Sequence, residues 1–329
     1  MTEVKMDKLL TISVAAYNVA GFIEKTLDSC VIPELLDQLE VIIEDDGATD
    51  NTAELAKVYC EKYPDTFRLI RKENGGYGST VDRSIKEARG KYFKLLDGDD
   101  WFDRDGLIYL VSQLKEHDCD LHLNRYYYVK DVSFEQSLCE DLWNEYEGKE
   151  LPVSDVHCEL KLGIWHTTVK TDLLKILDYE MPKHTLYTDQ LFLLRFMPYI
   201  KNIYFDRTPV YCYRIGRDGQ SVSKDGLIKH YKEAVLVFKE GICIRNTAKG
   251  EDPDVLRLMD TRISKNLYFT LEALLLLKRS KEHYKEVKEL MDYCRENAPE
   301  VYEHSIKVSG RIRLLHRTGY LAYLILAGR

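Results

Sequence analysis

The chain has 329 residues, with 47 lysines and arginines against 55 aspartates and glutamates, which gives a formal net charge of −8. This length allows one large domain or two smaller ones, and the acidic balance disfavours nucleic acid as a partner. Eight scattered cysteines without a CxxC pair argue against zinc and against a disulfide scaffold. We see no signal peptide and no apolar run of membrane-spanning length, so we expect a cytoplasmic protein.

The first 130 residues alternate between short apolar runs and helix-like segments. Strands are predicted at residues 9–16, 39–43, 67–70, 92–96 and 121–129. Helices are predicted at residues 21–30, about 79–88 and about 103–114, and a further helix that carries Leu55, Ala56 and Tyr59 is predicted after a cap at one of residues 49–51. Near-continuous apolar strands joined by helices predict an α/β fold, with a Rossmann-like, mostly parallel sheet covered by helices on both faces.

The rest of the chain is less regular and then becomes helical. Residues 131–155 predict an irregular insertion, and Pro209 suggests that the strand expected at 203–213 lies at a sheet edge. Further segments are a mixed strand and helix at 164–177 and helices at 187–197, 227–242 and 255–278. An apolar stripe in the last helix is predicted core, and consists of Met259, Ile263, Leu267, Leu271 and Leu274. We expect a first domain at 1–225 and a helical extension at 226–329.

Polar side chains follow three of the predicted strands at the point where each strand ends. Tyr17 and Asn18 follow the first, residues 44–46 follow the second, and residues 97–100 follow the fourth. Because the carboxyl ends of parallel strands meet at one edge of a sheet, where ligands bind, we expect the three clusters to converge on one site. If the three clusters were only solvent-exposed loops, nothing would predict polar clusters at three equivalent strand ends.

The sequence Asp-Gly-Asp-Asp at residues 97–100 is a candidate metal site. Asp97 and Asp99 are two residues apart and would share one face of a continuing strand, while Gly98 would let a ligand approach. Carboxylates suit Mg²⁺ or Mn²⁺, with a phosphate completing the coordination shell. The alternative is an acidic turn before a helix that starts near Asp103.

Four segments in order resemble the family 2 glycosyltransferases, which have a GT-A fold. They are ISVAAYN at 12–18, EDDGATD at 44–50, ENGG at 73–76 and DGDD at 97–100. The resemblance implies transfer of a sugar, with inversion, from a nucleotide-sugar donor to a glycan or lipid-linked acceptor. It also implies a UDP-sugar as the commonest donor, Mn²⁺ or Mg²⁺ as cofactor, and surface polysaccharide synthesis as the setting.

The resemblance assigns roles to individual residues. The expected donor-binding residues are Ala15, Tyr17, Asn18, Asp46, Lys72, Gly75, Asp97, Arg214 and Arg217. Ala15 and Tyr17 would lie against the nucleobase of the donor, and Asp46 would form a hydrogen bond with that nucleobase or with the ribose. Asp97 and Asp99 match the DXD motif at the ribose and the metal, with Asp100 as the alternative metal ligand. The two arginines would pair with the diphosphate, although exposed arginines in a turn are an equal alternative.

A base that removes the acceptor's proton is expected elsewhere in the chain. Asp189 matches the family's base position at the start of a helix, although Thr188 stands where an acidic residue is usual. The alternative is a simple helix N-cap. Trp165 and His166 are candidate acceptor contacts, because flat apolar faces stack on sugar rings.

The C-terminal residues 311–329 combine basic side chains with an apolar run. This pattern predicts an amphipathic helix that lies on the inner, anionic face of a membrane. The alternative is a helix that packs on its own protein or on a dimer partner.

Two other functions fit parts of the pattern. A sugar nucleotidyltransferase would ordinarily have a basic, glycine-rich loop after the first strand, and residues 16–21 contain no basic residue. A non-catalytic module that binds a nucleotide-sugar or a glycan would not need the three aspartates Asp97, Asp99 and Asp189.

Overall fold

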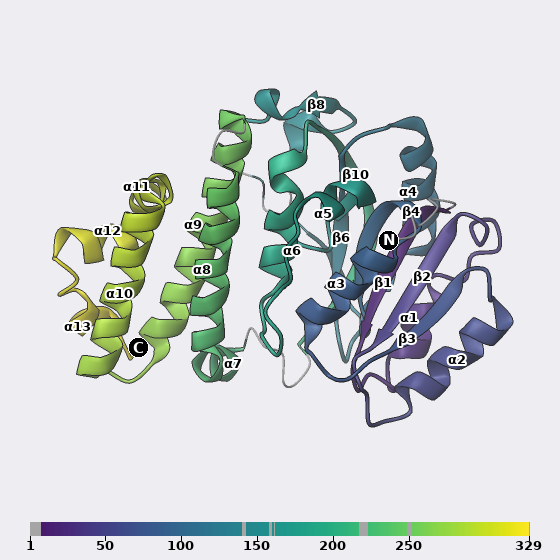
Figure 1. Ribbon diagram of the computed structural model, residues 1–329, viewed down its shortest axis with the longest axis horizontal. Helices are drawn as coiled ribbons and strands as arrows, with labels where there is room; N and C mark the ends of the chain where they lie inside the picture. The colour runs from purple at the N-terminus through teal and green to yellow at the C-terminus, as the bar shows by residue number, and fades with distance from the viewer. Residues whose placement is uncertain are drawn as a thin grey trace. The chain divides into compact units, whose positions relative to one another are not determined.

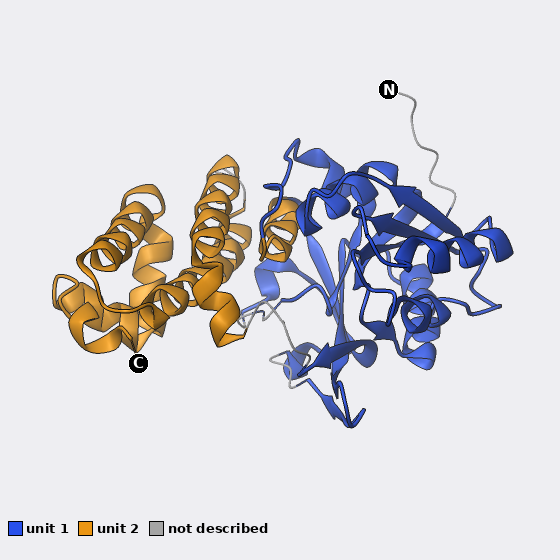
Figure 2. Cartoon of the chain, turned by 90° about the horizontal axis from the view of Figure 1, so that it is seen from below, with its two compact units in different colours: residues 1–185, 199–217 blue, residues 186–198, 218–329 orange. Residues whose placement is uncertain are grey.

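The structure is a computed structural model that describes residues 8–139, 143–157, 160, 162–216, 223–248 and 252–328. The chain divides into two compact units (Figure 2). The first comprises residues 1–185 and 199–217, and the second comprises residues 186–198 and 218–329. The predicted boundary at 225/226 therefore lies near the last division, at 217/218. The sequence did not indicate that residues 186–198 belong with the second unit.

Four parallel strands form one side of the sheet in the first unit (Figure 1). They are β1 (Lys8–Ala16), β2 (Leu39–Asp45), β3 (Phe67–Arg71) and β4 (Gly90–Asp97). All seven residues of β2 are buried, as expected of a strand covered by helices on both faces.

The other side of the sheet mixes strand directions. Its strands are β5 (Trp101–Phe102), β6 (Leu121–Lys130), β7 (Gln136–Leu138), β8 (Glu150–Pro152), β9 (Thr167–Lys170) and β10 (Asn202–Ile215). The main order is β3-β2-β1-β4-β9-β6-β10-β5, with β7 paired to β6 and β8 to β10. The long pairings β1–β2, β1–β4, β2–β3 and β6–β10 are parallel. The predicted mostly parallel α/β fold is therefore confirmed.

Pro209 is not on an edge strand, which corrects the prediction made from it. Strand β10 lies between β6 and β5, and its register with β6 shifts on either side of Pro209. At such a bulge the missing N–H of proline removes no regular ladder hydrogen bond. Proline is compatible with an inner strand here for that reason.

Helices cover the sheet of the first unit. They are α1 (Ile23–Asp28), α2 (Thr52–Lys62), α3 (Tyr77–Glu87), α4 (Arg104–Glu116) and α5 (Thr171–Ile176). Helix α4 starts where the sequence predicts, because the Asp103 side chain accepts a hydrogen bond from the Gly106 amide at 2.8 Å. Residues 131–155 contain β7, β8 and two short 3₁₀ turns, η1 (Asn144–Tyr146) and η2 (Val153–Asp155), in line with the irregular insertion expected there.

The described part of the second unit is helical. Its helices are α6 (Asp189–Phe196), α7 (Lys224–Lys229), α8 (Tyr231–Thr247), α9 (Pro253–Leu276), α10 (Lys281–Asn297), α11 (Pro299–Val308), α12 (Gly310–Arg317) and α13 (Tyr323–Leu326). The predicted apolar stripe of α9 is fully buried, which confirms it as core. Within the described chain, no helix combines the length and the apolar character needed to cross a membrane.

Candidate active site

The polar ends of the three strands converge at one sheet edge, as predicted. Ala15, near the end of β1, pairs with Glu44 of β2 on one side and with Asp97 of β4 on the other. The Gly98 amide donates to the Ala15 carbonyl at 3.1 Å. The Asp46 amide donates to the Ala16 carbonyl at 3.0 Å. The pairing of β1 with both neighbours therefore fixes the start of each polar loop.

The turn at residues 97–100 is held rigidly. Its own hydrogen bond runs from the Asp100 amide to the Asp97 carbonyl at 3.0 Å. From α1, the Thr26 hydroxyl lies 2.9 Å from the Gly98 carbonyl oxygen and 2.7 Å from that of Asp100. A Cβ at Gly98 would lie 2.6 Å from the Ala15 carbonyl oxygen, so this position requires glycine.

Asp100 supports the turn from inside the protein, which corrects its assignment as a metal ligand. It is 1 % exposed, and its carboxylate accepts hydrogen bonds from the Arg214 amide and the Tyr211 hydroxyl, both at 2.7 Å. Burial raises the pKa of Asp100 well above its usual value, and the charges of Asp97 and Asp99 add to the effect. Asp97 and Asp99 keep part of their surface exposed, so these two aspartates remain the candidate metal ligands.

Arg214 also lies behind the turn, which corrects the expectation that it pairs with the diphosphate. It is 5 % exposed, its Nε donates to the Asp99 carbonyl at 2.8 Å, and its Nη1 donates to Asp131 at 2.7 Å. Its guanidinium lies 5.1 Å from the ring centroid of Trp101, a cation–π distance. Arg217, the second predicted arginine, lies outside the described residues.

Asp46 organises the glycine turn that precedes α3. Its two carboxylate oxygens accept hydrogen bonds from the amides of Gly75 and Gly76, each at 2.8 Å, and it forms an ion pair with Lys72. The Lys72 ammonium also donates to Ser79 at 2.7 Å. Asp46 is buried, so the structure gives it a positioning role. The contacts with a donor that we assigned to Asp46, Lys72 and Gly75 stay predictions.

The first strand ends in side chains that remain accessible. Tyr17 is 49 % exposed, and Ala15 is half-buried. Asn18 has a left-handed φ of 53°, and its side-chain oxygen accepts a hydrogen bond from the Thr49 amide at 2.8 Å. Asn18 thus ties the loop after β1 to the loop after β2, and the base contacts expected of Ala15 and Tyr17 stay predictions.

Asp189 is the first residue of α6, in the second unit. The side chain of Thr188, the N-cap residue, makes no capping hydrogen bond among the described residues, so Thr188 does not act as a side-chain cap. Asp189 accepts a hydrogen bond from Gln190 at 2.7 Å, and Gln190 in turn accepts one from Arg262. Burial raises the pKa of Asp189, and the nearby charge of Arg262 partly opposes this shift. A raised pKa suits a general base.

The segment that enters α6 is fixed within the second unit. Tyr187 has a φ of 65°, which is uncommon for a residue with a side chain. The Leu186 amide donates to Glu233 at 2.6 Å, and His230 lies 2.6 Å from the other oxygen of that carboxylate. These contacts set the direction in which the chain reaches Asp189.

A divalent cation fits the sheet edge at Asp97 and Asp99 only if a bound molecule supplies further oxygen ligands. The described residues contain no group of three or more His, Cys, Asp or Glu side chains arranged to hold a metal. Asp97 and Asp99 offer two hard oxygen ligands, and Mg²⁺ is commonly bound by one or two carboxylates plus substrate phosphates. The residues present therefore fit a cation that arrives with a diphosphate.

Comparison with known proteins identifies the first unit. The family model described as glycosyl transferase family 2 matches residues 11–168, which include the three strand ends, the glycine turn and Trp165. Residues 11–168 belong to glycosyl transferase family 2.

Curated proteins similar to this chain include two glycosyltransferases and a teichoic acid biosynthesis protein. GlyG of Streptococcus pneumoniae is described as a glycosyltransferase and is 24 % identical over 81 % of this chain and 90 % of its own length. GlyA from the same organism is 25 % identical over 54 % of this chain, but the match spans only 27 % of GlyA. The minor teichoic acid biosynthesis protein GgaB of Bacillus subtilis is 24 % identical over 76 % of this chain and 25 % of its own length.

Solved structures share its fold along nearly the whole chain. Residues 1–349 of Staphylococcus aureus TarS, in complex with UDP-GlcNAc, superpose with a TM-score of 0.72 at 20 % identity, over 96 % of this chain and 89 % of that one. The mannosyltransferase PcManGT of Pyrobaculum calidifontis, in complex with GDP-Man and Mn²⁺, gives 0.53 at 16 % identity, over 96 % and 85 %. The GT-A fold expected of a family 2 glycosyltransferase is confirmed.

The acceptor candidates of this glycosyltransferase differ in accessibility. Trp165 is half-buried and stacks on Tyr213, with ring centroids 4.4 Å apart. His166 is buried, accepts a hydrogen bond from the Gly163 amide at 3.1 Å, and lies 3.6 Å from the Cys139 sulfur. A buried imidazole of this kind does not reach a sugar, so the prediction that His166 contacts the acceptor is wrong, and His166 is a structural residue. The acceptor contact expected of Trp165 stays a prediction.

Lys94 is a buried positioning residue that sequence reasoning did not identify. It lies in the middle of β4 with no exposed surface, and its ammonium donates to the carbonyls of Trp165 and Thr167, each at 3.2 Å. Burial lowers the pKa of Lys94 to about 7. A lysine in an otherwise apolar strand was the only available signal. It holds the segment that carries Trp165.

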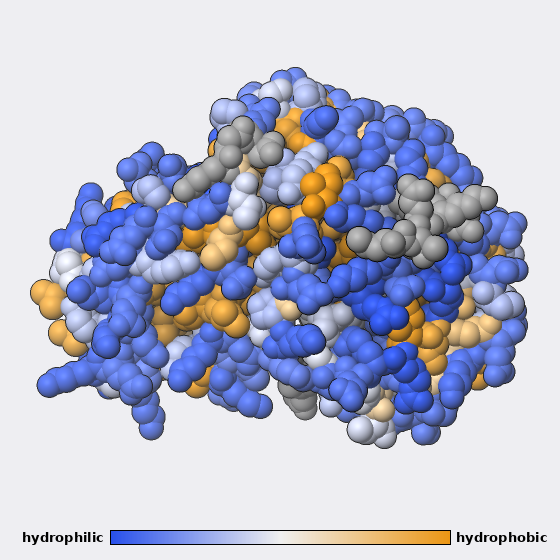
Figure 3. Space-filling view, viewed as in Figure 1, coloured by the Kyte–Doolittle hydropathy of each residue, from blue (hydrophilic) through white to orange (hydrophobic). Residues whose placement is uncertain are grey.

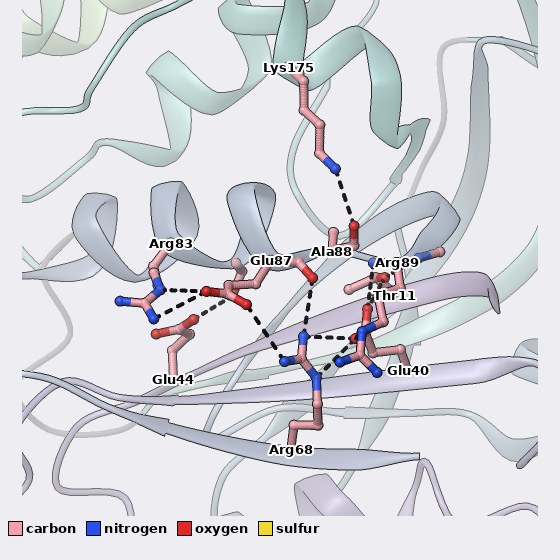
Figure 4. Close-up of polar contacts among 11 residues, drawn as sticks. Thr11, Glu40, Glu44, Arg68, Arg83, Glu87, Ala88, Arg89 and Lys175 are labelled. Atoms are coloured by element: carbon pink, nitrogen blue, oxygen red, sulfur yellow. Dashed lines mark hydrogen bonds and ion pairs between the residues drawn. The ribbon is translucent and has the colours of Figure 1, made fainter. Parts of the chain in front are cut away.

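Glu44 is a second buried group whose environment the sequence did not reveal. Two glutamates four residues apart on β2 differ sharply (Figure 4). Glu40 accepts hydrogen bonds from Thr11, Arg68 and the Arg89 amide at 2.7–3.0 Å. Glu44 has no exposed surface, and its side chain makes a long hydrogen bond with Ser84, at 3.3 Å. Burial raises the pKa of Glu44 to about 7, despite opposing contributions from Ser84, Arg83 and Lys72.

Glu44 should make the stability of the protein depend on pH. Its pKa is about 7 in the folded protein against an ordinary 4.5, so between these values the folded state binds more protons than the unfolded state. The free energy of unfolding should therefore fall as pH rises through this window, by on the order of 3 kcal/mol. Glu44→Gln should remove this fall and be more stable than the wild type at pH 8.

Urea unfolding at pH 5 and pH 8 measures the effect. Glu40→Gln is the matched control on the same strand, and it should be less stable than the wild type at pH 8, because it weakens a fully bonded carboxylate. If Glu44→Gln lost stability at pH 8 as Glu40→Gln does, Glu44 would be a well-paired carboxylate and our interpretation would be wrong.

Proposed function

We propose that this protein transfers a sugar, with inversion, from a UDP-sugar to a glycan or lipid-linked acceptor during surface polysaccharide synthesis. The observation that carries the proposal is the convergence of three polar strand ends on a turn in which Asp97 and Asp99 are half-buried and Asp100 is fully buried. A TarS fragment with the same fold is in complex with UDP-GlcNAc, and GgaB is named for teichoic acid biosynthesis, which supports a UDP donor and a cell-surface product.

The proposed reaction is a single displacement at the anomeric carbon. The acceptor hydroxyl oxygen forms the new glycosidic bond, its proton passes to the Asp189 carboxylate, and the bond from the sugar to the diphosphate breaks with its electron pair going to the phosphate oxygen. Asp97 and Asp99 would hold Mn²⁺ or Mg²⁺ together with the diphosphate, and the bound cation would stabilise the charge on the leaving group. Attack opposite the leaving group inverts the anomeric carbon.

The donor site is tested by calorimetric titration of UDP with and without Mn²⁺. Wild type should bind UDP tightly only when Mn²⁺ is present, and Asp99→Ala should lose this dependence together with most of the affinity. Asp105→Ala, which removes a carboxylate from the exposed start of α4, serves as the control and should bind as the wild type does. Failure of UDP to bind in any condition would refute the UDP-sugar assignment.

The same preparation separates a transferase from a binding module. Slow, Mn²⁺-dependent hydrolysis of the right UDP-sugar is expected of a transferase without its acceptor, and UDP release reports it. A module that only holds nucleotide-sugar would bind UDP and release none from any UDP-sugar offered.

A further inference from the structure

The end of the described chain presents a basic and apolar surface that stays exposed among the described residues. Five of the fourteen large apolar residues that are exposed in the described chain fall within 18 residues, and they are Val308, Leu314, Leu321, Leu324 and Ile325. We call this set the C-terminal surface. Figure 3 shows apolar atoms at the left-hand edge of the molecule, where α12 and α13 lie in Figure 1. Such clustering marks an interaction site more often than scattered exposed residues do.

Hydrogen bonds anchor the segment that carries the C-terminal surface to the helices beside it. The Tyr320 hydroxyl donates to Asp292 at 2.9 Å, and the Tyr323 hydroxyl lies 3.2 Å from the Ser280 amide nitrogen. The Arg279 side chain donates to the Ala327 carbonyl at 2.9 Å, and the Gly328 amide donates to the Leu275 carbonyl at 2.8 Å. These contacts hold the segment against α9 and α10.

Anchored in this way, the segment turns its apolar side chains outward. Leu321, Leu324 and Ile325 are 62 %, 56 % and 58 % exposed, whereas Ala322 and Tyr323 between them are buried. Positions three and four apart in a helical turn share one face. The three side chains therefore form one outward-facing apolar face.

The C-terminal segment itself carries charge of a single sign, although Arg311 forms an ion pair with Glu272 of α9 and Arg313 donates to the Ile306 carbonyl. From His304 to Gly328 the chain contains four basic residues, Lys307, Arg311, Arg313 and Arg317, and no acidic residue. In α12, Ile312 and Leu315 are buried, while Leu314 and Arg317, three apart, are exposed together. The whole chain has a formal net charge of −8, so this basic segment contrasts with the rest of the protein.

We propose that the C-terminal surface docks on an anionic lipid bilayer, with Leu321, Leu324 and Ile325 entering the interface and the exposed Lys307 and Arg317 pairing with lipid headgroups. Apolar side chains bordered by lysine and arginine are the pattern of helices that lie in a membrane interface. A two-fold contact between copies would bring the same basic residues face to face, so charge complementarity favours the membrane over a second copy. The proposal does not depend on the donor chemistry proposed above.

Vesicle sedimentation of the full chain tests the proposal. Wild type should sediment with vesicles of phosphatidylcholine mixed with phosphatidylglycerol, and it should not sediment with phosphatidylcholine alone. The variant Leu321→Gln/Leu324→Gln/Ile325→Gln should lose more than about tenfold in affinity for the mixed vesicles. Lys307→Gln/Arg317→Gln should lose roughly 30-fold, and the wild type should be released by high salt.

The control is Val58→Gln, which changes an equally exposed apolar residue on α2 (57 % exposed) and should bind as the wild type does. Circular dichroism checks the fold of each variant, and the basic double variant tests the proposal even if the apolar triple variant misfolds. Equal binding to both vesicle types, or unchanged binding by a folded triple variant, would overturn it. So would a wild-type dimer that the triple variant converts to a monomer in light scattering, because the C-terminal surface would then be a subunit interface. The sedimentation assay contains no nucleotide-sugar, so its result does not depend on whether the proposed transferase reaction is correct.

Discussion

Asp189→Asn is expected to lower kcat for sugar transfer by about 10²- to 10⁴-fold, the range for loss of a general base, with little change in UDP affinity. Asparagine keeps the size of the side chain and can still contact Gln190, but it cannot accept the proton of the acceptor hydroxyl. Steady-state kinetics with a cognate donor and acceptor give kcat, and calorimetry gives the affinity for UDP in the same buffer.

A matched control separates this loss from an effect on helix stability. Asp254 occupies the first turn of α9 in the same unit, as Asp189 does in α6. Asp254→Asn should therefore weaken its helix end to a similar extent and leave kcat unchanged. An equal loss in both variants would mean that Asp189 contributes only to the helix terminus.

The pH dependence of kcat offers an independent check on Asp189. Burial raises the pKa of its carboxyl, and only the deprotonated form can accept a proton. The rate should therefore fall as pH drops through a pKa above the ordinary aspartate range, and the residual rate of Asp189→Asn should lack this limb. A wild-type profile that stays flat down to the ordinary aspartate pKa would contradict the assignment.

Tyr211→Phe is expected to destabilise the protein by about 3 kcal/mol and to weaken Mn²⁺-dependent UDP binding by more than about tenfold. The tyrosine is fully buried, and its hydroxyl donates to Asp100 at 2.7 Å and accepts from the Asp97 amide at 3.0 Å. Removing it leaves two buried groups without that partner, each worth roughly 1–3 kcal/mol. Because both partners lie in the turn that presents Asp97 and Asp99, the loss should reach the donor site.

Tyr204→Phe provides the comparison on the same strand. Its hydroxyl donates to Gln113 at 2.9 Å, and Gln113 belongs to α4, not to the turn at residues 97–100. This variant should lose about 1 kcal/mol and bind UDP as the wild type does. Urea unfolding and calorimetry measure both quantities, and equal UDP affinities for the two variants would show that Tyr211 has no positioning role.

The sheet edge could be predicted from the sequence because several local signals agreed. Apolar runs that end in Tyr17, Glu44 and Asp97 leave few alternatives to parallel strands, and the topology of such sheets then brings their ends together. The partners of charged side chains could not be predicted in this way. An arginine near a site has the same sequence signature whether it faces a ligand or, like Arg214, bonds the backbone of a turn 115 residues away.

Two further features depended on distant packing. Pro209 is a local signal for an edge strand, but the bulge that accommodates it arises from the pairing of β10 with β6. The pattern of α6 predicts a helix, yet no local feature shows that it packs on α8. A Cβ added to Gly241 of α8 would lie only 3.0 Å from Leu194 of α6, and this close approach becomes visible only in three dimensions.

The path of the chain through α6 has a consequence for how this protein can be divided. Residues 186–198 leave the first unit, join the C-terminal helices, and return. A fragment that stops after β10 would therefore retain Asp189 but lose α8 and α9, which supply Glu233 and Arg262 around it. If Asp189 is the base and the first unit binds the donor, as proposed, truncation would abolish turnover without abolishing UDP binding, so an inactive fragment would not show that the missing helices recognise the acceptor.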